Sequence, residues 1–263
     1  MYVLGLTYGV VASALPLTGE NVIPAENSGF PFIVSIQDEK QGGDVNQKHI
    51  CTGTLISRKH ILTTAHCFDD QSRLDGYQIL YGSSDLRECD RYSLKSRISY
   101  KEWSKKTGKT PAFVDNDIAI LTMSREISTP SFQPASLSKK NVYQFYGLIA
   151  ETAGWGDMMN HESPFFLQTA SLEILDHESC SQKLNLILGY AVELITPYLC
   201  STAAPYTKIS FGDSGGPIFY KGRKIIGINK GFGRSYSSNP VETNVHIALN
   251  FYRGFIRDVI EHE

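Results

Sequence analysis

The sequence lacks several features that would assign it to other classes of protein. Lysine and arginine number 25 against 27 aspartates and glutamates, the two signs are interspersed, and no segment forms a basic stripe. Nucleic-acid binding normally requires such a stripe, so we expect no nucleic-acid partner. Beyond the first residues, no apolar run approaches the roughly 20 residues that a membrane-spanning helix needs. We therefore expect no membrane association.

Cysteine is scarce as well. The chain has five cysteines, none of them in a CxxC pair and none beside a cluster of histidines, so a structural zinc site is disfavoured. No acidic loop indicates calcium, and we expect neither a metal ion nor a cofactor. In an exported chain, an odd number suggests two disulfides and one free thiol, although spacing alone does not identify the pairs. The five are Cys51, Cys67, Cys89, Cys180 and Cys200.

The beginning of the chain is mostly apolar. Residues 3–15 contain Ala12-Ser13-Ala14, the small-x-small pattern of a signal peptidase site. This predicts a signal peptide over residues 1–14 and a secreted, extracellular protein. The alternative is an apolar N-terminal strand, because Met1-Tyr2 supplies no Lys or Arg. A membrane anchor is disfavoured since Pro16 interrupts the run early.

Short runs with strand character recur along the chain, separated by polar turns that contain glycine. This spacing predicts an all-β protein of barrels or sandwiches, with the tightest hairpin at Lys221-Gly222. Helix signals are few: one covers Asn250 to Glu263 with Asn250 as N-cap, and a shorter one covers His177 to Leu184 behind Asp176. The expected strands are 32–36, 52–57, 77–81, 118–123, 148–153, 166–174, 218–220 and 224–228.

Three separate segments carry candidate chemistry. Glycines on both sides of Ser214, in Gly212-Asp213-Ser214-Gly215-Gly216-Pro217, permit a tight turn that exposes the Ser214 hydroxyl and backbone N–H groups. A serine hydroxyl is a weak nucleophile, so it needs a neutral imidazole as base and a carboxylate that orients the imidazole. His66 in Thr-Ala-His-Cys and Asp117 at the mouth of an apolar strand supply them. Each residue alone has an ordinary structural explanation, but together they predict a triad.

The motifs Thr-Ala-His-Cys, Asn-Asp-Ile-Ala-Ile-Leu and Gly-Asp-Ser-Gly-Gly-Pro resemble, in this order, the three signatures of the chymotrypsin and trypsin family. The resemblance extends from about residue 17 to the C-terminus. It implies two six-stranded antiparallel β-barrels with the active site between them and a C-terminal α-helix. The expected bounds are about 30–135 for the first barrel, about 136–249 for the second and about 250–263 for the helix, all within a peptidase domain over 15–263.

The same resemblance implies a role for each motif. His66 would act as general base and then acid, Asp117 would orient it, and Ser214 would form the acyl-enzyme. The backbone N–H groups of Gly212 and Ser214 would form the oxyanion hole. The implied function is a secreted, monomeric serine endopeptidase that acts on proteins or peptides, with protease inhibitors as further candidate partners. The implied disulfides are Cys51 with Cys67 and Cys180 with Cys200, which leaves Cys89 free.

The sequence departs from the family pattern around the specificity pocket. Lys208 stands at the position of the pocket base, so cleavage after Lys or Arg is not expected and acidic or polar residues are better candidates. Asn244 replaces a glycine of the pocket wall. Phe232 and Gly233 resemble the strand that pairs with substrate, but the segment Asn229 to Gly233 carries an extra residue. The alternative function is a protease-fold binding protein or a weakly active pseudoenzyme.

Activation also departs from the family pattern. In the family, a newly cut N-terminus places its α-amine beside the aspartate that precedes the nucleophile, here Asp213. The first basic residue is Lys40, beyond the start of the first barrel, so trypsin-like activation is not encoded. Removal of Leu15-Pro16 after signal cleavage would expose Leu17, and we predict that its amine pairs with Asp213. The alternatives are a start at Leu15 or a protein that stays zymogen-like.

Overall fold

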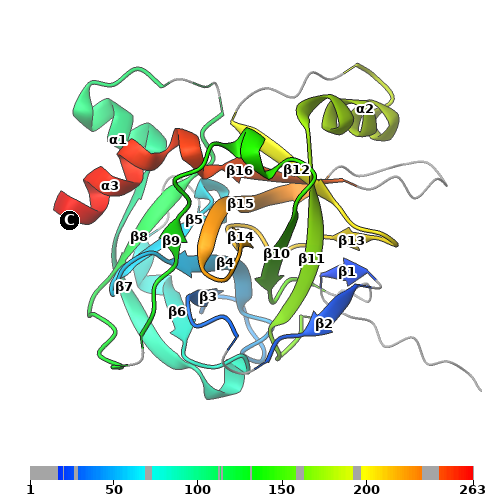
Figure 1. Cartoon of the computed structure of the whole chain (residues 1–263). Helices are drawn as coiled ribbons and strands as arrows, with labels where there is room; N and C mark the ends of the chain where they lie inside the picture. Colours follow the sequence, from blue (N-terminus) through cyan, green and yellow to red (C-terminus); the bar gives the residue numbers. More distant parts are fainter. Residues whose placement is uncertain are drawn as a thin grey trace, which may run out of the picture.

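The chain folds into two six-stranded antiparallel β-barrels and, among the described residues, three α-helices (Figure 1). The computed structural model describes residues 17–19, 21–26, 29–68, 73–111, 113, 115–130, 132–157, 163–191, 197–232 and 243–262. The expected signal segment, residues 1–14, lies outside them. In this part of the chain, no helix combines the length and apolar character that crossing a membrane requires.

The first barrel is built from residues 33 to 123. Its strands close in the order β3 (Ile33–Asp38), β4 (His49–Leu55), β5 (His60–Thr63), β8 (Ala119–Met123), β7 (Asp90–Ser99) and β6 (Tyr77–Tyr81). The inward side chains are aliphatic and buried, for example Val34, Ile61 and Ile120. Because β5 and β8 are neighbours, the segments that follow β5 and precede β8 meet at one end of the barrel.

The second barrel uses the later strands. Its order is β10 (Ile149–Gly154), β14 (Pro217–Tyr220), β15 (Lys224–Phe232), β16 (Asn244–Ala248), β12 (Tyr198–Thr202) and β11 (Gln168–Leu175), and pairing of β11 with β10 closes the ring. Outside the ring, β2 (Val22–Pro24) pairs with β11, β9 (Ser136–Leu137) pairs with β15, and β1 (Thr18–Gly19) pairs with β13 (Thr207–Lys208).

The C-terminal helix joins the two halves. Although α3 (Arg253–His262) follows the second barrel, it packs against α1 (Tyr100–Thr107), which follows β7 of the first (Figure 1). The rings of Tyr100 and Trp103 contact Phe255, and Trp103 Nε1 donates to Asp258 Oδ2 at 2.6 Å. The remaining helix is α2 (His177–Leu188), and 3-10 turns cover Ala65–Cys67, Leu74–Gly76, Leu86–Glu88, Val142–Phe145 and Leu249–Phe251.

Most expected elements are present with shifted ends. Strand β6 matches its predicted range, and the hairpin between β14 and β15 turns at Lys221 and Gly222, which both have positive φ (51° and 79°). Asp176 caps α2 by accepting from Ser179 N, but the helix runs on to Leu188. Asn250 as N-cap of the last helix is wrong: it lies in the 3-10 turn before α3, which begins at Arg253. Four barrel strands (β5, β7, β12 and β16), the short strands outside the rings and helix α1 were not predicted.

Candidate active site

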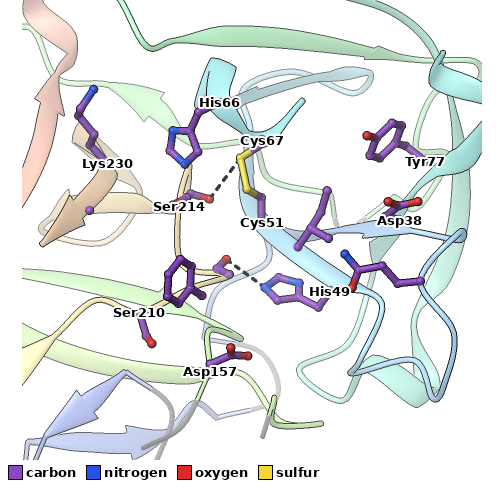
Figure 2. A pocket seen from close by; sticks show the side chains of 15 residues that line it. Asp38, His49, Cys51, His66, Cys67, Tyr77, Asp157, Ser210, Ser214 and Lys230 are labelled. Carbon is purple, nitrogen blue, oxygen red and sulfur yellow. Dashed lines mark hydrogen bonds between the residues drawn. A yellow bond between two sulfur atoms is a disulfide. The ribbon is translucent and has the colours of Figure 1, made fainter. Parts of the chain in front are cut away.

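A cleft of about 520 Å³ is lined by residues of both barrels and contains the predicted nucleophile and base (Figure 2). His66 and the Cys51–Cys67 disulfide lie on the side of the first barrel, and Gly212 and Ser214 on the side of the second. Figure 2 shows the His66 ring next to Ser214. The structure therefore brings together motifs that are far apart in the sequence.

Strand pairing brings His66 and Asp117 together. His66 lies in the 3-10 turn after β5, Asp117 lies just before β8, and Thr63 pairs with Ala119 where the two strands meet. His66 Nδ1 is 2.7 Å from Asp117 Oδ2, and the His66 backbone N–H donates to Asp117 Oδ1 at 2.9 Å. A carboxylate only accepts, so Nδ1 carries the proton and Nε2 is free to act as a base.

The environment of Asp117 keeps it ionised. Burial acts to raise its pKa, but the hydrogen bond and charge of His66, the charge of Lys230 and the backbone N–H of His66 together lower the pKa to about 2. The carboxylate is therefore charged at neutral pH and can stabilise a protonated imidazole.

The turn that carries Ser214 is pressed against the first barrel. Thr52 N–H donates to the Ser214 carbonyl at 2.9 Å, and Gly215 N–H donates to Asn229 O at 2.8 Å. Gly215 has φ 79°, and a Cβ there would lie 2.0 Å from Thr63 Oγ1. Only glycine fits this position. Among the described residues no hydrogen bond joins Ser214 Oγ to His66, and such bonds are often long before substrate binds.

Gly212 presents a backbone arrangement suited to an oxyanion. Its φ is 92°, and its carbonyl accepts from His49 Nε2 at 3.0 Å and from Thr52 Oγ1 at 2.9 Å. These two bonds fix the orientation of this peptide group. Within the described part of the chain, the N–H groups of Gly212 and Ser214 donate to no protein acceptor, so both remain available to a ligand.

His49 supports this arrangement from behind. Its ring is buried, its Nδ1 lies 2.7 Å from Ser35 Oγ, and Gln37 Nε2 donates to Ser35 Oγ at 2.6 Å. Burial lowers the pKa of His49 to about 4, although its bond to the Gly212 carbonyl acts the other way. His49 was not predicted as a site residue, because its partner lies 163 residues away and left no sequence signal.

Asp213 is a buried carboxyl. Its side chain is 0% exposed and accepts from Gly156 N–H at 2.9 Å and Ser210 N–H at 2.8 Å. In the described residues it forms no ion pair. Burial raises its pKa to about 7, the two N–H donors oppose this, and the charge of Asp157 adds to it. Leu17, the predicted activation residue, is also buried and packs in a cluster with Ile209 and two other apolar side chains.

The predicted pocket residues occupy different environments. Asn244 is buried, and its side chain accepts from Ile209 N–H at 2.9 Å and donates to Thr207 O at 2.8 Å. It therefore fills space beside the backbone of β13. Lys208 lies in that strand and pairs with Thr18 of β1. Phe232 ends β15 opposite Asn244, while Gly233 lies outside the described residues.

Lys230, which was not predicted as a site residue, also lines the cleft. The register between β15 and β16 shifts between Asn229 and Gly231, so the extra residue expected in this segment forms a β-bulge at Lys230. Its ammonium lies 3.3 Å from Asp117 Oδ2 and 2.5 Å from Asp115 Oδ2. Only the expected extra residue hinted at this position.

Both implied disulfides are present. Cys51 is bonded to Cys67 and Cys180 to Cys200, which leaves Cys89 as the free thiol. Among the described residues, the group of potential metal ligands consists of Cys51, His66 and Cys67. The two sulfurs of that group are joined to each other, so they are not available as thiolates.

The two barrels and the His, Asp and Ser groups at their junction define a serine-protease type of fold and site. A family model described as Trypsin matches residues 21–256, and the chain belongs to this family. It is 29% identical to Trypsin beta of Drosophila erecta over 218 residues, which cover 81% of this chain and 78% of that protein. It is also 29% identical to Trypsin of Simulium vittatum over 197 residues, 73% of this chain and 74% of that protein.

Similarity extends to much longer proteins. Over 195 residues the chain is 28% identical to Atrial natriuretic peptide-converting enzyme of Mus musculus. The match covers 72% of this chain but 16% of that protein. The chain therefore spans only a small part of the length of this relative.

Proposed function

We propose that this chain is a secreted serine endopeptidase that hydrolyses peptide bonds through an acyl-enzyme. The observation that carries the proposal is the pair of hydrogen bonds between His66 and Asp117, at 2.7 and 2.9 Å, beside Ser214 in one cleft. Membership of the trypsin family supports the same reaction class. The proposed extracellular location rests on the apolar N-terminal residues, and the monomeric state on the family resemblance alone.

The proposed reaction follows from the proton positions. Neutral His66 takes the Ser214 hydroxyl proton at Nε2 while Ser214 Oγ attacks the peptide carbonyl. Asp117 stabilises the imidazolium that forms, and the N–H groups of Gly212 and Ser214 bind the oxyanion. Collapse of the intermediate breaks the C–N bond, and His66 passes its proton to the leaving amine. Water, deprotonated by His66, then hydrolyses the acyl-enzyme by the reverse sequence.

The proposed substrates are proteins or peptides without Lys or Arg before the cleaved bond. The Asn244 side chain occupies space beside β13, which contains the predicted pocket base. Lys208, in β13, adds a positive charge there. A second cation would have to be desolvated next to this charge, which is unfavourable. Polar or acidic side chains fit better. Inhibitors that insert a substrate-like loop are the other proposed partners.

We further propose that activity requires a free α-amine at Leu17. Asp213 is buried without a cation among the described residues, and such a carboxylate is stabilised by a partner charge. Leu17 already packs against Ile209, four residues before Asp213 in the chain. N-terminal sequencing of the active secreted protein tests this proposal. An active form that begins at or before Ala14 would contradict it, and a start at Leu15 would replace Leu17 as the donor.

Reaction with a fluorophosphonate probe tests the catalytic proposal. The wild type should form a covalent adduct on Ser214, and Ser214→Ala should lose the adduct and about a millionfold in peptide turnover, as triad nucleophiles do. Ser136→Ala, in an exposed position on β9, is the matched control and should behave as the wild type. A folded wild-type protein with a free Leu17 amine that forms no adduct would favour the alternative, a protease-fold binding protein.

A further inference from the structure

A lysine lies next to the triad carboxylate, where it affects the same oxygen that holds the base. Lys230 Nζ is 3.3 Å from Asp117 Oδ2, and His66 Nδ1 is 2.7 Å from that oxygen. The ammonium and the imidazole are therefore within about 6 Å of each other. Figure 2 shows the two side chains on the same side of the cleft.

Local structure holds Lys230 in this position. The β-bulge re-aims its side chain, the Asp115 carboxylate binds it at 2.5 Å, and its ammonium lies 5.3 Å from the centre of the Tyr198 ring. The hydroxyl of Tyr198 donates to the same Asp115 oxygen at 2.6 Å. The Lys230 side chain is only 27% exposed, so water screens its charge less than that of a surface lysine.

The charges around Asp117 determine the direction of the effect. Burial acts to lower the pKa of Lys230, but the hydrogen bond to Asp115 and the charge of Asp117 raise it, so the ammonium stays charged. Asp115 opposes Lys230, but its side chain is 51% exposed, so water screens its charge more than that of Lys230. Two tyrosines nearby are neutral, since burial raises the pKa of Tyr198 to about 12 and also raises the pKa of Tyr252.

We propose that Lys230 is a positioning residue of the triad that shares Asp117 with His66 and keeps His66 in its neutral, base-competent form at mildly acidic pH. This inference rests on the proposed function. The physical reason is that a cation beside Asp117 offsets part of the negative field that would otherwise favour the imidazolium. Because Lys230 weakens the negative field of Asp117, the imidazolium that forms in the transition state is also stabilised less. The wider pH range is therefore accompanied by a lower maximal rate.

The pH dependence of kcat/KM tests the inference, because its acidic limb reports the base of the free enzyme. Lys230→Met keeps the stem and removes the charge, and should move the limb to higher pH by about one unit. Lys230→Arg keeps the charge and should stay near the wild type. Asp115→Asn removes the opposing charge and should move the limb to lower pH, by about half a unit. Lys224→Met, exposed on the same strand, is the matched control.

Opposite shifts of the acidic limb for Lys230→Met and Asp115→Asn would not arise from a merely structural role, because loss of structure would lower activity at every pH. A direct measurement separates this inference from the proposed function. In the Ser214→Ala background, the His66 ring can be titrated by NMR with labelled histidine, with and without Lys230→Met. Equal midpoints would overturn the role of Lys230 even if the enzyme is active. A shifted midpoint in a chain that forms no fluorophosphonate adduct would support the electrostatic role and refute the peptidase instead.

Discussion

The buried carboxyl of Asp213 should make stability depend on pH in a direction that can be calculated. Burial raises its pKa from 3.8 to about 7, against the hydrogen bonds from Ser210 and Gly156 and with a contribution from Asp157. The folded state therefore holds a proton that the unfolded chain releases. Stability is then lost as pH rises from about 4 to about 7 and stays at the lower value above that window. Between pH 4.5 and 7.5 the loss is about 3 kcal/mol.

Asp213→Asn removes this ionisation. The parent and Asp213→Asn, both in the Ser214→Ala background, are unfolded in urea at equilibrium, and unfolding is monitored by the fluorescence of the two buried tryptophans. We expect the free energy of unfolding to fall by about 3 kcal/mol more in the parent than in the Asn variant between pH 4.5 and 7.5. The variant should also lose about 1 to 3 kcal/mol at both pH values, because its amide faces a backbone donor.

Comparison of the two proteins is needed because other groups titrate in the same range. Burial lowers the pKa of His49 to about 4 and that of His246 to about 3, so these rings make stability rise with pH. Their contribution is the same in both proteins and cancels. Equal pH dependence within about 0.5 kcal/mol would refute the reasoning and mean that Asp213 ionises normally or has a cation partner. A chain that starts at Leu17 should lose the Asp213 effect.

Two further predictions concern backbone and thiol. Gly215→Ala should destabilise the chain by at least about 2 kcal/mol more than the control Gly222→Ala. Both glycines have φ 79°, but only at Gly215 would a Cβ meet Thr63. Equal losses of unfolding free energy in urea would contradict this. Burial raises the pKa of Cys89 to about 11, so iodoacetamide should alkylate it about a hundredfold more slowly at pH 8 than it alkylates the same thiol in the unfolded chain. Equal rates measured by mass spectrometry would contradict that.

Local motifs were sufficient to predict which residues form the candidate triad. The turn at Ser214 needs glycines on both sides because of positive φ and close contacts, and this requirement is visible in the sequence. The hairpin turn at Lys221-Gly222 and the cap at Asp176 follow from equally local rules. The resemblance then implied the barrels and both disulfides. Helix α1 was missed although its capping box at Ser99 and Glu102 and its C-cap at Gly108 are local signals. Strand β7 was missed because strand formation depends on packing against neighbouring strands.

By itself the sequence determined the candidate reacting groups, their order and the strand-rich class of fold, because hydroxyl, imidazole and carboxylate chemistry and turn geometry depend on residue type and immediate neighbours. Only the tertiary structure decided what surrounds them. The contact of Lys230 with Asp117 and the bond of His49 to the Gly212 carbonyl join residues that are far apart in the chain. The burial of the Asp213 carboxyl also depends on the packed structure around it. Electrostatic and burial effects depend on distance in space, and a single sequence does not contain those distances.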